Sequence, residues 1–203
     1  TKALLHFNGN NGAKEIVDSG ATGHVVTQVG TATLSSAQAK FGLCSLLLDG
    51  DSDYLTVPDH ADFDVFGSVA ESWTIDFWIR PANVTSEQMI VEQYVDGNNQ
   101  WWVTINATKI GWAAFTGGGA VVYLNASTGA NAIPTANQWY HVACVKKLNE
   151  YGVYINGVQK SYLTDNDTLT LAGGLQIGRD GAGGKYYNGY LDDLRIIKSN
   201  IFS

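Results

Sequence analysis

The chain has 203 residues, of which 45% are hydrophobic and 15% are charged, so it can bury a core without disulfide or metal support. Acidic residues outnumber basic ones by 19 to 12, and the net charge of −7 argues against nucleic acid and anionic membranes as partners, because no basic patch can bind phosphates. No apolar stretch approaches the roughly 20 residues of a membrane span, so we expect no membrane insertion.

Short runs rich in β-branched and aromatic residues recur along the chain, separated by clusters of Gly, Asn and Asp. No linker or repeat divides them, so we expect one domain over residues 1–203. So many strands in one domain usually pair as two stacked antiparallel sheets, which predicts an all-β sandwich. The runs predict about fourteen strands, near 3–7, 24–29, 45–49, 53–57, 72–80, 88–95, 100–106, 109–116, 119–125, 138–146, 151–155, 158–163, 174–178 and 189–198.

Two connecting segments carry their own signals. Residues 60–66 (HADFDVF) are the only stretch that favours a helical turn. Asn156–Gly157 lies between two apolar runs, which is the strongest local pattern for a two-residue β-hairpin. We therefore expect the strands at 151–155 and 158–163 to be antiparallel neighbours.

The segment SWTIDFWIRP contributes to the core and also presents one tryptophan outward. Alternation places Trp73, Phe77 and their neighbours at every second position on the core face, and Asp76 and Trp78 on the opposite face. Trp78 is either a stacking platform for a ligand or a large side chain that covers the outer layer beneath a loop. The second interpretation is the simpler one.

The two cysteines, Cys44 and Cys144, lie a hundred residues apart with no CxxC motif or histidine cluster nearby, which argues against zinc. We expect both to be free core residues. A disulfide stays open as the alternative if their strands are neighbours.

Arrangements that would indicate catalysis are weak. The nearest approach to paired carboxylates is Glu15 with Asp18, in a turn-rich segment, and no G-x-S-x-G motif occurs. His141 lies within an expected core strand and is interpreted as structural. The other histidines, at positions 6, 24 and 60, are scattered, with no spacing typical of metal ligands.

The segment YVDGNNQWW (94–102) is the best local match to a sugar-binding surface, in which aromatic rings stack on sugars and acidic or amide groups bind hydroxyls. Asp96, Asn98 and Asn99 supply the polar groups. Alternation places one of Trp101 and Trp102 in the core, and the more polar neighbours of Trp102 favour it as the outward one.

Aromatic residues on the following strands extend this candidate site. Trp112 lies on the next predicted strand and Tyr123 on the one after it, so a ladder of rings across the sheet is expected. The glycine-rich loop GRDGAGGKYY (178–187) is a second candidate, with Asp180 and Tyr186 as ligand-binding residues.

The last predicted strand, NGYLDDLRIIK (188–198), carries an unusual carboxylate. Strict alternation places Asp192 beside Leu194 on an apolar face and Asp193 beside Arg195, a plausible ion-pair partner. A lone charge on an apolar face is costly. Three partners are therefore possible for Asp192: a basic side chain from another strand, backbone N–H groups of a loop, or a calcium ion, which prefers oxygen ligands.

Seven segments in order make the sequence resemble the laminin-G-like, concanavalin A-like lectin/glucanase jelly-roll domains, in the version common in bacterial surface proteins and phage tail or appendage proteins. The resemblance implies a jelly-roll sandwich. This fold hosts lectins, glycosidases, lyases and adhesion modules, so it does not by itself select a function. The segments are ALLHFNGNNG…DSG (3–20), KFGLCSLLLDGDSDYLTV (40–57), SWTIDFWIRP (72–81), NQWYHVACVKK (137–147), YGVYINGV (151–158), LQIGRD (175–180) and YYNGYLDDLRIIK (186–198).

The resemblance also implies a structural calcium ion (Ca2+), because family members that bind one use an aspartate of the last strand together with the N-terminal loop. Carried over to this chain, Asp192 is the first candidate ligand, followed by Asp193 and Asp18. Asn8 adds a side-chain oxygen from the same loop. Such an ion would join the first strand to the last.

Three functions remain, from different classes. We favour a non-catalytic module that binds a glycan or cell-surface polysaccharide, placed outside the cell, on a cell surface or on a virion such as a phage appendage. The second is a structural or adhesive module that contacts protein partners. The third, a glycoside hydrolase- or lyase-like enzyme, is the weakest because paired carboxylates on one strand are missing.

Overall fold

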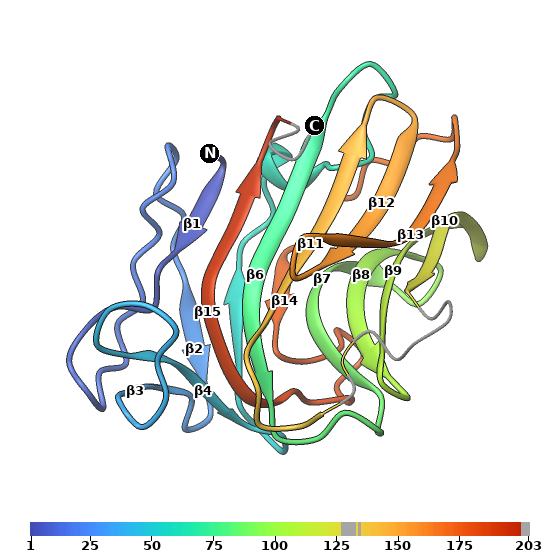
Figure 1. The fold of residues 1–203 in the computed structure, drawn as a ribbon. Helices are drawn as coiled ribbons and strands as arrows, with labels where there is room; N and C mark the ends of the chain where they lie inside the picture. The colour runs from blue at the N-terminus through green and yellow to red at the C-terminus, as the bar shows by residue number, and fades with distance from the viewer. Residues whose placement is uncertain (127–132, 134, 200–203) are drawn as a thin grey trace.

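The computed structural model describes residues 1–126, 133 and 135–199, which form two stacked antiparallel sheets (Figure 1). The predicted all-β sandwich is confirmed, and each of the fourteen predicted strands is present to within three residues at either end. The domain boundary at 1–203 stays a prediction. Within the described residues, no helix is long and apolar enough to cross a membrane.

The first sheet, sheet A, contains eight strands. Its main path runs β13-β12-β11-β6-β15-β4-β3, and β1 pairs with the part of β15 that β4 leaves unpaired, so that the first and last strands lie side by side (blue and red in Figure 1). The strands are β1 (Ala3–Leu5), β3 (Thr33–Ser35), β4 (Ser45–Asp49), β6 (Trp73–Pro81), β11 (Tyr140–Lys147), β12 (Glu150–Ile155), β13 (Val158–Thr164) and β15 (Asn188–Ile197).

The second sheet, sheet B, contains seven strands in the order β10-β9-β8-β7-β14-β5-β2. The short 3-10 helix η1 (Ala61–Phe63) follows β5, as the pattern over 60–66 predicts. The strands are β2 (Thr27–Val29), β5 (Tyr54–Val57), β7 (Gln88–Asp96), β8 (Asn99–Asn106), β9 (Lys109–Thr116), β10 (Gly119–Ala126) and β14 (Leu175–Ile177).

The core lies between the sheets and follows the predicted alternation. Trp73 and Phe77 of β6 are buried on its core side, while Asp76 and Trp78 project to the outer side. At the predicted hairpin, Asn156 and Gly157 both have positive φ (50° and 79°), as a turn that matches the strand twist requires. Strand β3 was not predicted, because its only large apolar residue is Leu34.

Strand β15 departs from strict alternation, and this corrects the predicted environment of Asp192. Asp193 has a φ of +47° and forms a β-bulge, so Asp192 pairs across from Trp78 while Arg195 pairs across from Asp76. Both Asp192 and Arg195 therefore belong to the outer face of sheet A. Leu194 belongs to the core face, and the prediction that Asp192 shares an apolar face with it was wrong.

The bulge lies where β15 changes neighbours. The first half of β15 pairs with β4 over residues 188–191, and its second half pairs with β1 over 194–196. In the gap between the two partners, Asp192 Oδ2 accepts backbone N–H bonds from Lys40 (2.8 Å) and Phe41 (3.0 Å). Three partners were considered for Asp192: a basic side chain, loop N–H groups and calcium. The contacts in the structure are with loop N–H groups.

The two cysteines are free and buried, as expected, and the disulfide alternative is wrong. Cys144 faces the core from the middle of β11, and burial raises the pKa of its thiol well above the ordinary value.

Candidate functional site

A groove of about 200 Å³ lies on the outer face of sheet B, where side chains from β8, β9 and β10 project away from the core. This volume is below the roughly 300–1,000 Å³ of pockets that bind drug-sized ligands, and it has room for about one sugar ring. Its lining residues are Glu87, Trp102, Thr104, Asn106, Ala107, Lys109, Gly111, Tyr123 and Asn125.

Two aromatic rings, those of Trp102 and Tyr123, line the groove, and Phe115 packs beside them. Trp102, on β8, is partly exposed and stacks on Phe115 with ring centroids 6.0 Å apart and an interplanar angle of 28°. Tyr123, on β10, meets Trp102 edge-on at 6.0 Å and keeps 54% of its surface exposed. The prediction that Trp102 is the outward tryptophan agrees with this position.

The polar part of the groove lies next to these rings along the same strands. Thr104 and Asn106 follow Trp102 at every second position of β8, and Asn125 follows Tyr123 in the same way on β10. Within the described residues, these three side chains have no hydrogen-bond partner. Period-2 alternation starting from Trp102 would have identified Thr104 and Asn106 in the sequence, and alternation from Tyr123 would have identified Asn125.

Glycine forms the floor of the groove. Gly111, on β9, lies across from Thr104, and a Cβ added there would come within 3.0 Å of both the Thr104 hydroxyl and the Trp102 ring. The absence of a side chain at Gly111 therefore makes room for the Trp102 ring and for the groove.

Two of the predicted ligand-binding tryptophans are not available for binding. Trp101 is 1% exposed, and its Nε1–H donates to Gln93 Oε1 (2.7 Å) and to the Phe63 carbonyl (3.1 Å). Trp112 is fully buried in the core. The expected ladder of rings therefore includes Phe115 in place of Trp112, because the side chain of Phe115 points to the outer face of β9 and that of Trp112 points to the core.

The acidic, amide-rich turn does not contribute side chains to the groove. Asp96 accepts the Asn98 N–H (2.8 Å) and the Asn99 amide (3.0 and 3.1 Å). The side-chain oxygen of Asn99, Oδ1, in turn accepts the Gly117 N–H from the next hairpin (3.1 Å). These polar groups join two turns of sheet B and serve the fold.

The glycine-rich loop 178–187 lies beside the groove and is connected to it by ion pairs. Lys185 lies 3.2 Å from Glu87, which lines the groove, and 3.6 Å from Asp180. Tyr186 contacts Tyr54 on β5, with ring centroids 6.4 Å apart. Among the two predicted residues of this loop, Asp180 is therefore connected to the groove and Tyr186 is packed elsewhere.

The same loop covers a buried carboxyl. Glu92, on β7, pairs across from Trp102 but is fully buried, and its Oε2 accepts the Gly181 N–H at 2.5 Å. Burial raises the pKa of Glu92 to about 7, because this hydrogen bond only partly compensates for lost hydration. The carboxyl faces the loop and is not among the groove residues.

The outer face of sheet A also contains a hollow, of about 230 Å³, but its charges are paired with one another. Arg195 donates to both oxygens of Asp76 (2.9 and 2.7 Å), and His141 Nε2 lies 3.3 Å from the same carboxylate. Burial raises the pKa of Asp76, but the contacts with His141 and Arg195 outweigh it and hold the pKa below its usual value. Asp193 pairs with His6 (2.6 Å) and not with Arg195, contrary to prediction.

Trp78 lies on this face and is covered by a loop, in agreement with the simpler interpretation. The Lys40 Nζ lies 3.9 Å from the centroid of its ring, and Phe41 meets it edge-on at 5.7 Å. The same two residues donate the backbone N–H bonds to Asp192.

The carboxylates predicted to bind calcium are engaged in hydrogen bonds within the described residues. Asp18 Oδ1 accepts the N–H groups of Leu4 (2.8 Å) and Gly20 (2.7 Å), and its Oδ2 accepts that of His24 (2.8 Å). Asp192 faces two N–H groups and Asp193 faces an imidazole. Calcium requires six to eight oxygen ligands, whereas these carboxylates already bind N–H donors.

Asn8, the fourth predicted calcium ligand, is exposed and its amide lies against Gly42. Only Asp192 Oδ1 is a buried oxygen without a partner among the described residues of this region. Calcium therefore stays a prediction from the resemblance, and nothing below depends on it.

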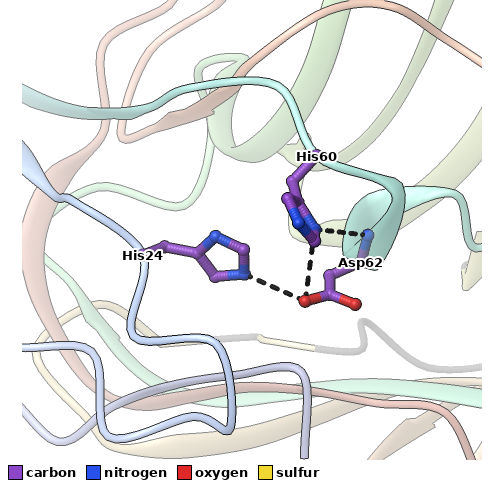
Figure 2. Close-up of side chains that lie close together, drawn as sticks. All are labelled: His24, His60 and Asp62. Atoms are coloured by element: carbon purple, nitrogen blue, oxygen red, sulfur yellow. Dashed lines mark hydrogen bonds and ion pairs between the residues drawn. The ribbon is translucent and has the colours of Figure 1, made fainter.

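One cluster of possible metal ligands was not foreseen. His24, His60 and Asp62 each bring a ligand atom to within 4.8 Å of the other two (Figure 2). The expectation of scattered histidines was wrong for His24 and His60, which meet because the 18–24 segment folds against η1. Their separation in the sequence gave no local signal.

Comparisons with solved structures find the same fold in toxin binding domains. The botulinum neurotoxin serotype G binding domain is 16% identical, with a TM-score of 0.72, and the serotype D binding domain is 18% identical, with a TM-score of 0.73. Each match covers 98% of this chain and 48% of the toxin chain, so this chain spans about half the length of those proteins.

A third match is a structure of botulinum neurotoxin type C, a toxin whose cell entry is dependent upon interaction with two ganglioside molecules. It is 16% identical, with a TM-score of 0.71, and covers 98% of this chain and 48% of the toxin chain. Likenesses at this level of identity show the fold alone. No curated protein matches the sequence.

A family model connects the sequence itself to this fold. The model of the concanavalin A-like lectin/glucanases superfamily matches residues 49–201, well over half of the chain, including every strand that lines the groove. The chain therefore belongs to the concanavalin A-like lectin/glucanases superfamily.

Proposed function

We propose that this chain is a non-catalytic glycan-binding module and that the groove on the outer face of sheet B is its binding site. One observation carries the proposal: Trp102 and Tyr123 form an aromatic wall directly beside Thr104, Asn106 and Asn125. Sugar rings present an apolar face bordered by hydroxyls, and an aromatic platform beside amide and hydroxyl groups complements both features.

The family membership and the fold support a lectin-like role, and the toxin likenesses indicate which glycans to test first. One of the similar toxins depends on gangliosides for cell entry, so sialylated glycans belong on the test panel. A module that recognises surface glycans would act outside the cell. Attachment to a bacterial surface or to a virion is part of the same proposal.

Binding is favoured over hydrolysis by the state of the nearby carboxylates. Glu87 lines the groove but is ion-paired with Lys185, and Glu92 is covered by the 178–187 loop. A glycosidase needs two carboxyl groups that flank the scissile bond from within the site. The described groove offers only Glu87.

The proposal is tested by a glycan array followed by titration of the best binder. We expect Trp102→Ala to weaken the affinity about 30-fold, which corresponds to about 2 kcal/mol for a lost stacking platform. Trp78→Ala is the matched control, because Trp78 is also an outward tryptophan in a central region of a strand but is covered by Lys40 and Phe41.

The control should keep the wild-type affinity. Equal losses in both variants would contradict the groove as the site. Full binding by the Trp102 variant, or release of reducing ends from the bound oligosaccharide, would overturn the proposed function.

A further inference from the structure

We infer that His24, His60 and Asp62 form a binding site for a divalent transition metal, zinc in the first place, between the 18–24 segment and η1. The three side chains converge on one point from two separate parts of the chain (Figure 2). His24 Nε2 lies 3.3 Å and His60 Nδ1 lies 3.2 Å from the same oxygen, Asp62 Oδ2.

Two of the three separations between ligand atoms are close to those of a zinc site. Bonds of about 2.1 Å at the tetrahedral angle place neighbouring ligand atoms about 3.4 Å apart. The two nitrogen–oxygen distances, 3.3 and 3.2 Å, are close to that value. A set of two imidazoles and one carboxylate, with a fourth position left for water, is one that zinc commonly takes.

The backbone holds the three ligands in place. Asp18 accepts the N–H group of His24 (2.8 Å) and thereby fixes the segment that carries it. His60 is the N-cap of η1, where its Nδ1 accepts the Asp62 N–H at 3.1 Å, and a metal bound at Nδ1 would replace this hydrogen bond. The site is thus assembled by contacts that belong to the fold.

The buried nitrogen of His24 makes no well-formed hydrogen bond among the described residues. The side chain of His24 is 7% exposed, and the contact of its Nε2 with Asp62 Oδ2, at 3.3 Å, has the distance of an ion pair without the geometry of a hydrogen bond. A buried polar atom without a partner is costly, and a cation between this nitrogen and the carboxylate would remove that cost.

The carboxylate of Asp62 is held in position by two further contacts. Lys2 Nζ lies 2.7 Å from Asp62 Oδ1, and Thr22 Oγ1 donates to Oδ2 at 2.5 Å. Such outer contacts orient a ligating carboxylate.

His60 provides the route for the metal. Its side chain is 46% exposed, whereas those of His24 and Asp62 are each 7% exposed, so an ion would arrive from the His60 side and keep a water there. The bound metal would join the N-terminal segment to the helix that follows β5. Its role would be to stabilise the native fold.

The test uses the full chain, prepared without a polyhistidine tag, and titrates it with Zn2+ by calorimetry and with Co2+ by visible absorption. We expect one ion per chain and the intense absorption band of tetrahedral Co2+. We also expect Zn2+ at about 100 times its dissociation constant to raise the Tm by about 5–10 °C.

Two variants decide the assignment. His60→Ala should abolish binding of both ions, and because His60 is half exposed this variant should still fold. His6→Ala is the matched control, since His6 is 45% exposed and also places Nδ1 beside a carboxylate, that of Asp193, but is not part of the cluster. It should bind like the wild type.

The inference is overturned by wild-type protein that binds neither ion at about 1 mM, a concentration of about a thousand times a micromolar dissociation constant. It is also overturned if His60→Ala binds normally. Loss of binding in His24→Gln, with its fold verified by the same melting curve, would complete the assignment to this cluster.

Discussion

Trp78 and Trp102 look equivalent in the sequence, since each is an outward-facing tryptophan on a long strand, but the two sheets use them differently. On sheet A, Lys40 and Phe41 cover Trp78, and the hollow beside it contains paired charges. On sheet B, Trp102 keeps aromatic neighbours and borders hydroxyl and amide groups that are unpaired within the described residues. A binding surface is therefore indicated by unpaired polar groups beside a ring more than by an exposed ring alone.

The strongest way to test this difference is to break the charge network of sheet A. Asp76→Ala leaves Arg195 without its bidentate partner, and we expect the free energy of unfolding to fall by about 3 kcal/mol. Denaturant unfolding measures this loss.

Glycan affinity of the folded Asp76 variant should be unchanged, because Asp76 lies on the opposite sheet from the groove. A loss of affinity that exceeds the loss of folded protein would show that the two faces are not independent.

On sheet B, the buried carboxyl of Glu92 predicts a pH-dependent contribution to stability. Its folded pKa of about 7 lies above the ordinary value of 4.5, so the folded state binds the proton more tightly than the unfolded state does. This contribution is complete below pH 4.5 and is lost as the pH rises through 7, up to about 3 kcal/mol in total. We expect Glu92→Gln to gain stability relative to the wild type between pH 5 and pH 8.

The measurement is urea unfolding of both proteins at several pH values. A stability difference that does not change with pH would contradict the raised pKa of Glu92. Protonation of carboxylates with lowered pKa, such as Asp76, acts in both proteins below about pH 4 and cancels in the difference.

The tyrosines allow a finer test with closely matched exposure. Tyr123, in the groove, and Tyr162, on β13, are each 54% exposed. We expect Tyr123→Ala to weaken glycan binding about fivefold, near 1 kcal/mol, with little effect on stability. Tyr162→Ala should leave the affinity unchanged in the same titration, and a loss in both variants would indicate nonspecific binding.

The smallest expected effect concerns the cover of Trp78. Lys40→Ala removes the ammonium above the ring but keeps the backbone N–H bond to Asp192, so stability should fall by about 0.5–1 kcal/mol. The exposed Trp78 ring should not gain affinity for glycans. Gained binding would mean that exposure alone makes a site.

Period-2 alternation and turn residues predicted most of the fold and the centre of the groove. Alternation succeeded at Trp102 because β8 is regular there, and continuing the same phase leads to Thr104 and Asn106. It failed at Asp192, because the bulge at Asp193 reverses which residues of the strand face the core. A strict alternation pattern does not allow for such a change within one strand.

Other features depend on contacts that sequence spacing does not encode. The polar groups of Asp96 and Asn99 are used by neighbouring turns, and a local pattern cannot distinguish that use from ligand binding. His24 and His60 meet only because a loop of the N-terminal segment packs on η1.

The two free cysteines, Cys44 and Cys144, can serve as native probes of local unfolding. Cys44 precedes β4 and Cys144 lies within β11, and both thiols are shielded from water in the closed fold. Each can be modified only when its surroundings open, so the two labelling rates, separated by mass spectrometry after digestion, would compare local opening near the N-terminal segment with opening at the centre of sheet A. No engineered probe is required for that comparison.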